Sequence, residues 1–244
     1  MAQPHDAPHM QTAEPGARHF LKAFSDPEAV ARYTNGPRRF VPGLDALHRM
    51  TGLLIAEAAP DDAHILVLGA GGGLELRALA DAQPGWTFTG VDPSAEMLGL
   101  ARETMGHHAS RAELIAGYID DAPEGHFDAA VCLATLHFLD DDERLRTVRE
   151  IHRRLKPGAP FVVAHGSYPQ DRPGEKDLWL SRYAAFAVAS GVDPDLAAGA
   201  RTAVGQMVNM VPPARDEAIL REAGFNDASL FYAAFTFRGW IGHA

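Results

Sequence analysis

From residue 64 to residue 164, short apolar runs alternate with longer segments in which apolar residues recur at helical spacing. The runs His64–Leu68 and Ala129–Ala134 are apolar almost throughout, which is typical of parallel strands covered by helices on both faces. The predicted strands and helices follow one another as His64–Leu68, Leu74–Ala82, Thr87–Val91, Ala95–Thr104, Glu113–Ala116, Ala129–Ala134, Asp141–Leu155 and Phe161–Ala164. This alternation predicts an α/β fold with a parallel sheet and helices on both of its faces.

The amino-terminal quarter of the chain precedes this alternating core, which we place at residues 61–165. Residues 1–15 are polar with several Pro and Ala residues, so we expect a flexible tail. Residues 16–60 are expected to form a helical cap, because Gly43–Ala58 carries apolar residues at three- and four-residue spacing.

Two segments follow the core. Residues 166–213 break the alternation with a Pro- and charge-rich opening, and we expect a helical insertion over the mouth of the sheet. Residues 214–244 are expected to complete the core with a helix and two strands. Because almost no residues separate the two strands, they are expected to form an antiparallel hairpin. The expected elements are the helices Lys176–Ser190, Pro194–Met210 and Arg215–Ala223 and the strands Ala228–Ala233 and Phe235–Ile241.

Composition narrows the function classes. The net charge of -10 works against a stable grip on nucleic acid, which needs a basic surface, and suits a small-molecule partner better. The single cysteine, Cys132, excludes an internal disulfide, and the twelve histidines show no metal-ligand spacing, so we expect no metal site. The chain lacks a signal-peptide pattern and an apolar run of about 18 residues, so we expect a cytoplasmic protein without a membrane span.

A glycine-rich turn, Leu68-Gly69-Ala70-Gly71-Gly72-Gly73, separates the first predicted strand from the helix after it. Glycines let a ligand approach the backbone, and the helix N-terminus that follows points at that ligand. A nicotinamide dinucleotide site is expected to show the spacing GxGxxG. Here the third glycine comes one place early, at Gly73, with Leu74 after it, and this spacing disfavours a nicotinamide oxidoreductase.

The second predicted strand leads into Asp92, whose carboxylate can accept two hydrogen bonds from a ribose diol. Ser94 stands at the N-cap position of the next helix. Met97 in that helix either packs its thioether on an adenine ring or belongs to the core. The end of this strand therefore predicts a nucleoside site.

The glycine turn is one of four segments that are specific when they occur in this order. They are Leu68–Gly73, Gly90–Met97, Phe127–His137 and Leu155–Ala159. In these segments, which span about Ala63 to Ala164, the chain resembles the class I S-adenosylmethionine-dependent methyltransferases. The resemblance implies a Rossmann-like seven-stranded methyltransferase sheet with a terminal antiparallel hairpin. It also implies S-adenosyl-L-methionine as cofactor and S-adenosyl-L-homocysteine as product.

The resemblance further implies which residues bind the cofactor. The glycine turn would line the methionine and ribose portions, and Asp92 would hold the ribose hydroxyls. Met97, with Tyr118 or Ile119, would flank the adenine, and Asp120 or Asp121 would take its amino group. Leu133 and Ala134 would present backbone oxygen near the methionine ammonium. The expected contacts are Gly69, Ala70, Gly71, Gly73, Asp92, Pro93, Met97, Tyr118, Ile119, Asp120, Leu133 and Ala134.

The segment from residue 33 to residue 43 resembles the entry strip of methyltransferases related to the carboxy-S-adenosylmethionine synthases, in which a tyrosine and an arginine close over the cofactor. A ring at Tyr33 beside a sulfonium would gain cation–π attraction, and the guanidinium of Arg38 can fork onto the methionine carboxylate. The alternative is that both residues are ordinary surface residues of the cap.

Two histidines follow predicted strands at positions where a general base would stand, His137 after the fourth strand and His165 after the fifth. Methyl transfer from a sulfonium is an in-line displacement that mainly needs alignment of the reactants. A base is needed only when the attacking atom keeps its proton at working pH. Both histidines are candidate catalytic residues, and a structural role is the alternative for each.

The insertion carries a stripe of large side chains at helix-like spacing, with Arg182 among them. The stripe consists of Trp179, Tyr183, Phe186, Met207 and Met210. It forms either core, a homodimer face, or the wall of an acceptor pocket in which Arg182 meets a substrate carboxylate. We predict methyl transfer to a small, partly apolar acceptor. A carboxy-S-adenosylmethionine synthase-like enzyme and a catalytically silent cofactor-binding scaffold are the alternatives.

Overall fold

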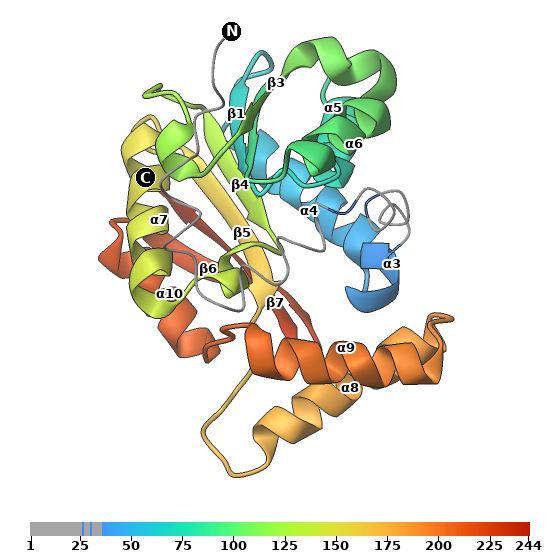
Figure 1. Cartoon of the computed structure of the whole chain (residues 1–244). Helices are drawn as coiled ribbons and strands as arrows, with labels where there is room; N and C mark the ends of the chain where they lie inside the picture. Colours follow the sequence, from blue (N-terminus) through green and yellow to red (C-terminus); the bar gives the residue numbers. More distant parts are fainter. Residues whose placement is uncertain (1–25, 27–29, 31–35) are drawn as a thin grey trace, which may run out of the picture.

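The computed structural model describes residues 36–244 together with Asp26 and Val30. In this part of the chain one seven-stranded sheet has the order β3-β2-β1-β4-β5-β7-β6 (Figure 1). The strands are β1 (His64–Leu68), β2 (Thr87–Asp92), β3 (Ala112–Ala116), β4 (Ala129–Leu133), β5 (Pro160–Gly166), β6 (Asn226–Ala234) and β7 (Phe237–His243). Strands β1 to β5 are parallel, and β7 runs antiparallel to both β5 and β6. The predicted α/β sheet with a terminal antiparallel hairpin is confirmed.

Helices cover both faces of this sheet because its strands are apolar on both sides. In β1, Ile65 and Val67 pack into the cluster formed with α4, α5 and α6, whereas Leu66 and Leu68 pack into the cluster formed with α7 and α10. The helices are α3 (Gly36–Phe40), α4 (Leu44–Ala56), α5 (Leu74–Ala82), α6 (Ala95–Met105), α7 (Asp141–Arg154), α8 (Glu175–Ala189), α9 (Pro194–Met207) and α10 (Pro213–Glu222), with 3-10 turns η3 (Gly106–Arg111), η4 (Ile119–Asp121) and η5 (Leu136–Phe138). None of the helices in the described residues has the length and apolar character that crossing a membrane requires.

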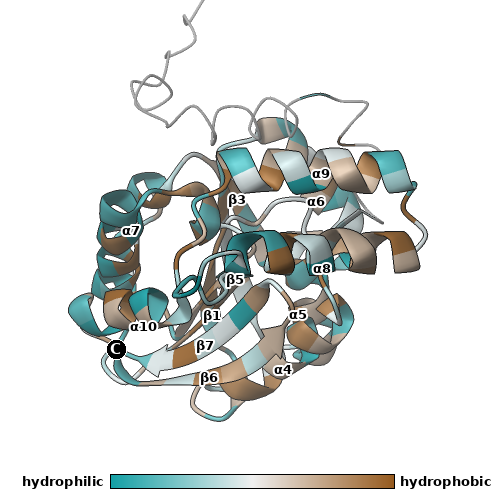
Figure 2. Cartoon of the chain, turned by 90° about the horizontal axis from the view of Figure 1, so that it is seen from below, coloured by the Kyte–Doolittle hydropathy of each residue, from teal (hydrophilic) through white to brown (hydrophobic). Residues whose placement is uncertain are grey.

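Helices α8 and α9 lie side by side at the edge of the sheet where β5 ends (Figures 1 and 2). Their contact is close, since a Cβ added at Gly205 of α9 would lie 2.8 Å from Leu180 of α8. Helix α8 also packs on α3, where the rings of Tyr183 and Phe40 stack with centroids 5.4 Å apart. The two helices of the insertion therefore lie beside the end of β5 and against α3.

The hairpin turn differs from the sequence prediction by two residues. Phe235 was expected to begin the last strand, but it has φ of 49° and forms the turn, so that β7 begins at Phe237. Glycine or asparagine usually occupies such a left-handed position, so the sequence gives no signal for a turn here. The helix expected to reach Met210 likewise ends at Met207, because the backbone N–H of Asn209 donates to the carbonyl of His137 instead of continuing the helix.

Candidate functional site

The glycine turn joins the carboxyl end of β1 to α5. Gly69, Gly71 and Gly73 have φ of 75°, 46° and 77°, a region that L side chains rarely occupy. A Cβ at Gly69 would lie 1.9 Å from Oγ1 of Thr135, in the turn after β4. The turn therefore requires glycine, and it passes directly beside the end of β4. Such a glycine backbone leaves room for a ligand to approach.

Asp92 ties this turn to the end of β2. Its Oδ2 accepts from the backbone N–H of Gly71 at 2.9 Å, and its Oδ1 accepts from that of Ser94 at 2.9 Å. Burial raises the pKa of Asp92, although these two N–H donors act to lower it. Ser94 caps α6 as predicted, because its hydroxyl accepts from the backbone N–H of Met97. Each carboxylate oxygen of Asp92 keeps a lone pair for a ribose hydroxyl.

The apolar candidates for the adenine side lie near Asp92. Met97 and Ile119 are buried. The pKa of Tyr118 is raised by burial and by the charge of Asp92, which places the phenol close to that carboxylate. Pro93 is exposed at the start of the same turn. These side chains border one corner of the sheet, between the ends of β2 and β3.

The end of β4 is strained. Ala134 has φ of 54°, which costs a non-glycine residue on the order of 1–2 kcal/mol. The carbonyl of Leu133 accepts from the hydroxyl of Thr135 at 2.9 Å, and the N–H of Ala134 donates to the carbonyl of Ala164 in β5. Strained backbone concentrates at ligand sites, and this one faces the glycine turn.

The charged candidates at the rim are held by ion pairs. Asp120 lies 3.0 Å from Arg146 of α7, and Arg38 lies 3.0 Å from Asp45 of α4; both pairs are exposed. Tyr33 lies outside the described residues. Any contact of these groups with a cofactor has to compete with, or add to, the pairs that they already form.

Glu75 was not predicted as a site residue. It is the second residue of α5, it is 8% exposed, and it forms no ion pair with any described residue. Burial, aided by the charge of Asp92, raises its pKa to about 8. The signal was visible in the sequence, because Glu75 shares the helical stripe of Leu76 and Leu79, which are buried core residues.

His137, in η5 after β4, is a neutral imidazole. The backbone N–H of Gly166 donates to its Nδ1 at 2.9 Å, so the ring proton is on Nε2. Burial, together with the electrostatic effect of the neighbouring His165 and Arg144, lowers its pKa well below the usual value. In this tautomer His137 is a hydrogen-bond donor at Nε2.

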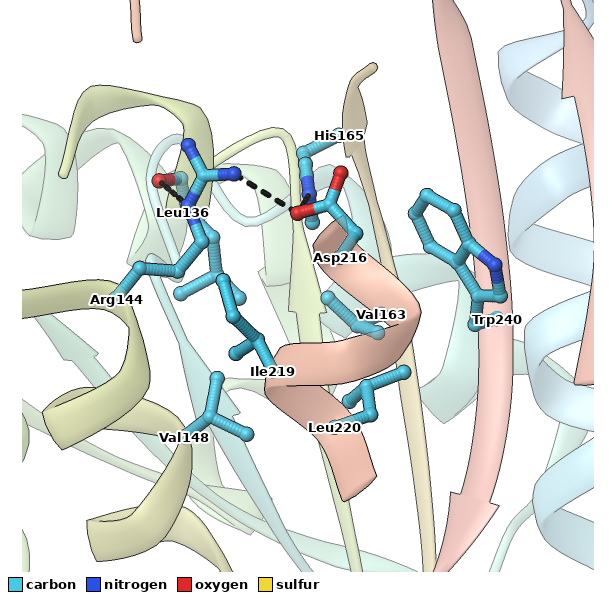
Figure 3. A pocket seen from close by; sticks show the side chains of 9 residues that line it. All are labelled: Leu136, Arg144, Val148, Val163, His165, Asp216, Ile219, Leu220 and Trp240. Carbon is cyan, nitrogen blue, oxygen red and sulfur yellow. Dashed lines mark hydrogen bonds and ion pairs between the residues drawn. The ribbon is translucent and has the colours of Figure 1, made fainter. Parts of the chain in front are cut away.

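His165, at the end of β5, belongs to a buried ion cluster between the sheet and α10. Its Nε2 lies 2.9 Å from Oδ1 of Asp216, and Arg144 of α7 donates to the same oxygen at 2.8 Å (Figure 3). Burial opposes the charge of Asp216, but His165 and Arg144 outweigh it and lower the pKa of the carboxyl. The cavity beside them measures about 10 Å³, which is room for about one water and too little for an acceptor.

The aromatic stripe of the insertion is divided between core and surface. Tyr183 is buried, and Met210 covers the end of β5, where its sulfur would lie 2.9 Å from a Cβ at Gly166. Trp179 is partly exposed, and the guanidinium groups of Arg182 and Arg238 lie 4.4 and 5.3 Å from the centroid of its ring. Phe186 and Met207 are partly exposed as well, and Trp179 differs from them by the two cations beside its ring.

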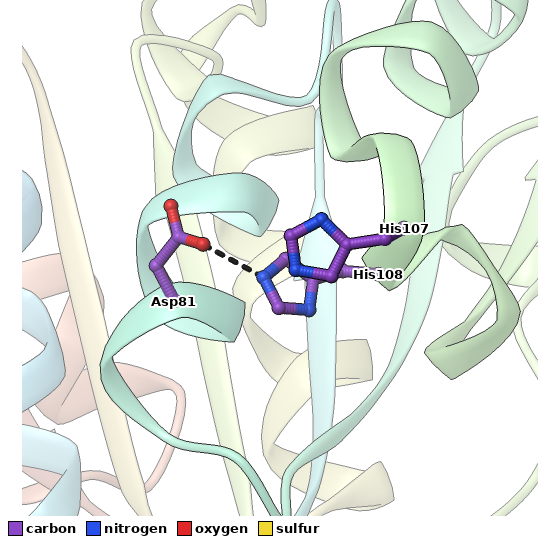
Figure 4. A group of neighbouring side chains, drawn as sticks. All are labelled: Asp81, His107 and His108. Carbon is purple, nitrogen blue, oxygen red and sulfur yellow. Dashed lines mark hydrogen bonds and ion pairs between the residues drawn. The ribbon is translucent and has the colours of Figure 1, made fainter.

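A histidine and aspartate cluster lies elsewhere, between the end of α5 and η3 (Figure 4). One donor atom from each of Asp81, His107 and His108 lies within 4.8 Å of the others. Sequence spacing did not reveal the cluster, because 26 residues separate Asp81 from His107. Arg77 donates to Asp81 at 2.7 Å and Arg111 to Nδ1 of His108 at 2.8 Å, so two cations already occupy the donor groups that a metal would need.

The chain is similar to proteins of a known family. Residues 65–158 match the family model described as a methyltransferase domain. The carboxy-S-adenosyl-L-methionine synthase of Chromohalobacter salexigens is 30% identical over 226 residues, which cover 88% of this chain and 81% of that protein. The synthase of Aeromonas hydrophila is 26% identical over 220 residues, with 88% of both chains covered.

Solved structures show the same fold. The structure described as PigF with SAH has a TM-score of 0.67 at 19% identity, and human N-acetylserotonin methyltransferase in complex with SAM has 0.63 at 16%. They cover 92% and 94% of this chain, which spans only 62% and 60% of theirs.

Proposed function

Because the chain belongs to the class I S-adenosylmethionine-dependent methyltransferase family, we propose that it transfers a methyl group from this cofactor to a small, partly apolar acceptor. The observation that carries the proposal is the glycine turn with its Gly71–Asp92 hydrogen bond at the carboxyl edge of β1 and β2. The residues present fit the cofactor: the turn has left-handed glycines, the Asp92 carboxylate keeps free lone pairs, and the buried Glu75 has no cation beside it among the described residues.

In this proposal the chain binds and orients the cofactor and the acceptor, and the cofactor supplies a methyl carbon activated by a sulfonium. The glycine turn would hold the methionine and ribose portions, and Asp92 the ribose hydroxyls. Met97, Tyr118 and Ile119 would flank the adenine. Alignment of acceptor and donor accounts for roughly 7–11 kcal/mol in well-oriented reactions, so the site needs little other chemistry.

Of the two histidine candidates, the proposal assigns contact with the acceptor to His137. Its Nδ1 is occupied by Gly166, so its Nε2–H would donate to an acceptor oxygen and fix that oxygen in line. The Nε2 of His165 is hydrogen-bonded to Asp216, and the cavity beside the ring is too small for an acceptor, so we propose that His165 positions the end of β5.

We propose that the acceptor binds beside Trp179, which lies in α8 of the insertion. An aromatic ring and two guanidinium groups suit an acceptor with an apolar body and a carboxylate.

The second candidate is a carboxy-S-adenosylmethionine synthase-like reaction, favoured by the relatives of that name. That reaction needs a cation for the added carboxylate. Among the candidates, Arg201 of α9 pairs with Asp177 at 3.3 Å on the surface, and Arg182 stacks on Trp179.

A turnover assay tests the proposal. The protein is incubated with S-adenosylmethionine and a panel of phenols, carboxylates and amines, and S-adenosylhomocysteine is measured. Release that depends on the acceptor supports methyl transfer. Cofactor binding without release from any member of the panel favours a silent binding protein.

A further inference from the structure

Glu75 stands two residues after Gly73, in the first turn of the helix that the glycine turn leads into. We propose that Glu75 receives the ammonium group at the amino-acid end of S-adenosylmethionine and gives up its own proton when the cofactor binds. The proposal rests on the cofactor of this family and not on the identity of the acceptor.

The carboxyl group of Glu75 lacks a partner of opposite charge among the described residues. A buried carboxylate without a cation is costly, and proteins normally pair it or keep it protonated. Asp216, which is also buried, is paired with the guanidinium of Arg144 and hydrogen-bonded to His165. Glu75 has no cation among the described residues, and the nearby carboxylate of Asp92 makes ionisation harder still. It is therefore placed to bind a cation that the described residues do not supply.

Among the described residues, the groups on the elements around Glu75 supply no alternative cation. On η3, which packs against the end of α5, Arg111 donates to the carbonyl of Ala80 and to Nδ1 of His108. Cys132 of β4 is an uncharged thiol whose pKa burial raises to about 12, and His48 of α4 is neutral because burial lowers its pKa to about 4. Arg77 of α5 is held by Asp81. On α6, the first-turn acid Glu96 is exposed and accepts from the hydroxyl of Ser94.

Glu75 closely follows the glycine turn along the chain. The same turn that would line the methionine portion continues into Glu75, so an acid here is placed for the positively charged end of that portion. The exchange balances: the O–H bond of the carboxylic acid breaks, the proton passes to the buffer, and the carboxylate pairs with the ammonium. Since Glu75 has a pKa of about 8 in the free protein, one proton is released per cofactor bound at neutral pH.

Calorimetric titrations of the full chain between pH 6 and pH 8 test the proposal. The ligands are S-adenosylmethionine, S-adenosylhomocysteine and 5'-methylthioadenosine, which lacks the amino-acid end. For the first two, wild-type affinity is expected to rise by up to about tenfold per pH unit more than that of Glu75→Gln, because linkage allows one proton per site. Buffers of different ionisation enthalpy should report the released proton in wild type only. For 5'-methylthioadenosine the two proteins should show the same dependence on pH, which also verifies that the variant is folded.

Glu96→Gln is the matched control, since Glu96 occupies the second position of α6 but is exposed. It should keep the wild-type dependence on pH. Equal slopes in wild type and Glu75→Gln would overturn the proposal. A wild-type affinity that falls with pH relative to Glu75→Gln would also overturn it, because Glu75 would then stay protonated and donate a hydrogen bond to the methionine carboxylate. A difference confined to S-adenosylmethionine would move the contact to the sulfonium and overturn the assignment to the ammonium. Failure of all three ligands to bind would instead count against the proposed function itself.

Discussion

The molecule buries carboxyl groups in two regions, on opposite faces of one sheet, and treats them differently. On the face covered by α7 and α10, Asp216 is held by Arg144 and His165 within 3 Å. On the face covered by α5, Glu75 is equally inaccessible and has no cation among the described residues. The compensated cluster has the features of a structural tie between elements, whereas the uncompensated acid marks a place where a ligand's charge is expected. Comparing the two separates groups that hold the fold from groups that bind.

The largest effect is expected when Asp216 loses the cation that pairs with it. Arg144→Met leaves Asp216 buried with His165 alone and is expected to lower the free energy of unfolding by about 3–5 kcal/mol. Urea unfolding at pH 7 measures it. Arg146→Met, two residues along the same helix, removes only exposed ion pairs and should cost less than about 1 kcal/mol. Similar losses in both variants would mean that burial does not distinguish these arginines.

The next effect concerns the cofactor edge. Asp92→Ala removes the acceptor of the Gly71 and Ser94 N–H groups and the proposed ribose contact. Loss of charge-assisted hydrogen bonds of about 1.5–3 kcal/mol should weaken S-adenosylhomocysteine binding about tenfold or more. Calorimetry measures the affinity, with the surface variant Asp81→Ala as the control. Unchanged affinity would place the ribose elsewhere.

The uncompensated side predicts a dependence of stability on pH. Glu75 has a pKa of about 8 in the folded chain against a usual value of 4.5, so between these pH values the folded state binds more protons than the unfolded state. Its contribution to stability therefore falls as pH rises, by up to about 1.4 kcal/mol per pH unit. Without ligand, the loss of stability from pH 6 to pH 7 should be smaller in Glu75→Gln than in wild type by about that amount. Parallel curves would show that Glu75 titrates normally.

The smallest effect lies at the adenine corner. If Asp120 takes the adenine amino group, Asp120→Ala should lower cofactor affinity by about 0.5–1.5 kcal/mol, the net value of one hydrogen bond. Arg146→Ala removes the partner of Asp120 without removing that contact and should leave the affinity unchanged. Equal losses would mean that the ion pair, rather than the carboxylate, supports the site.

The sequence predicted the parallel sheet well because its signals are local. The strand His64–Leu68 and the helix Leu74–Ala82 have the predicted bounds, since uninterrupted apolar runs and the glycine turn define them. The turn at Phe235 was missed because no residue there signals a left-handed backbone. The hydrogen bond from His165 to Asp216 joins residues 51 apart, and only tertiary packing brings them together. Glu75 could have been found from the sequence, because it is an acid on the apolar helical stripe of Leu76 and Leu79.

Mass spectrometry of a complete reaction tests whether the chain transfers the methyl group of S-adenosylmethionine to an acceptor. The protein is incubated with S-adenosylmethionine carrying an isotopically labelled methyl group and with an acceptor identified from the panel, and both products are weighed. We expect S-adenosylhomocysteine and the acceptor that has gained the labelled methyl group to form in equal amounts. A carboxylated cofactor that retains its methyl group, with the acceptor unlabelled, would contradict it.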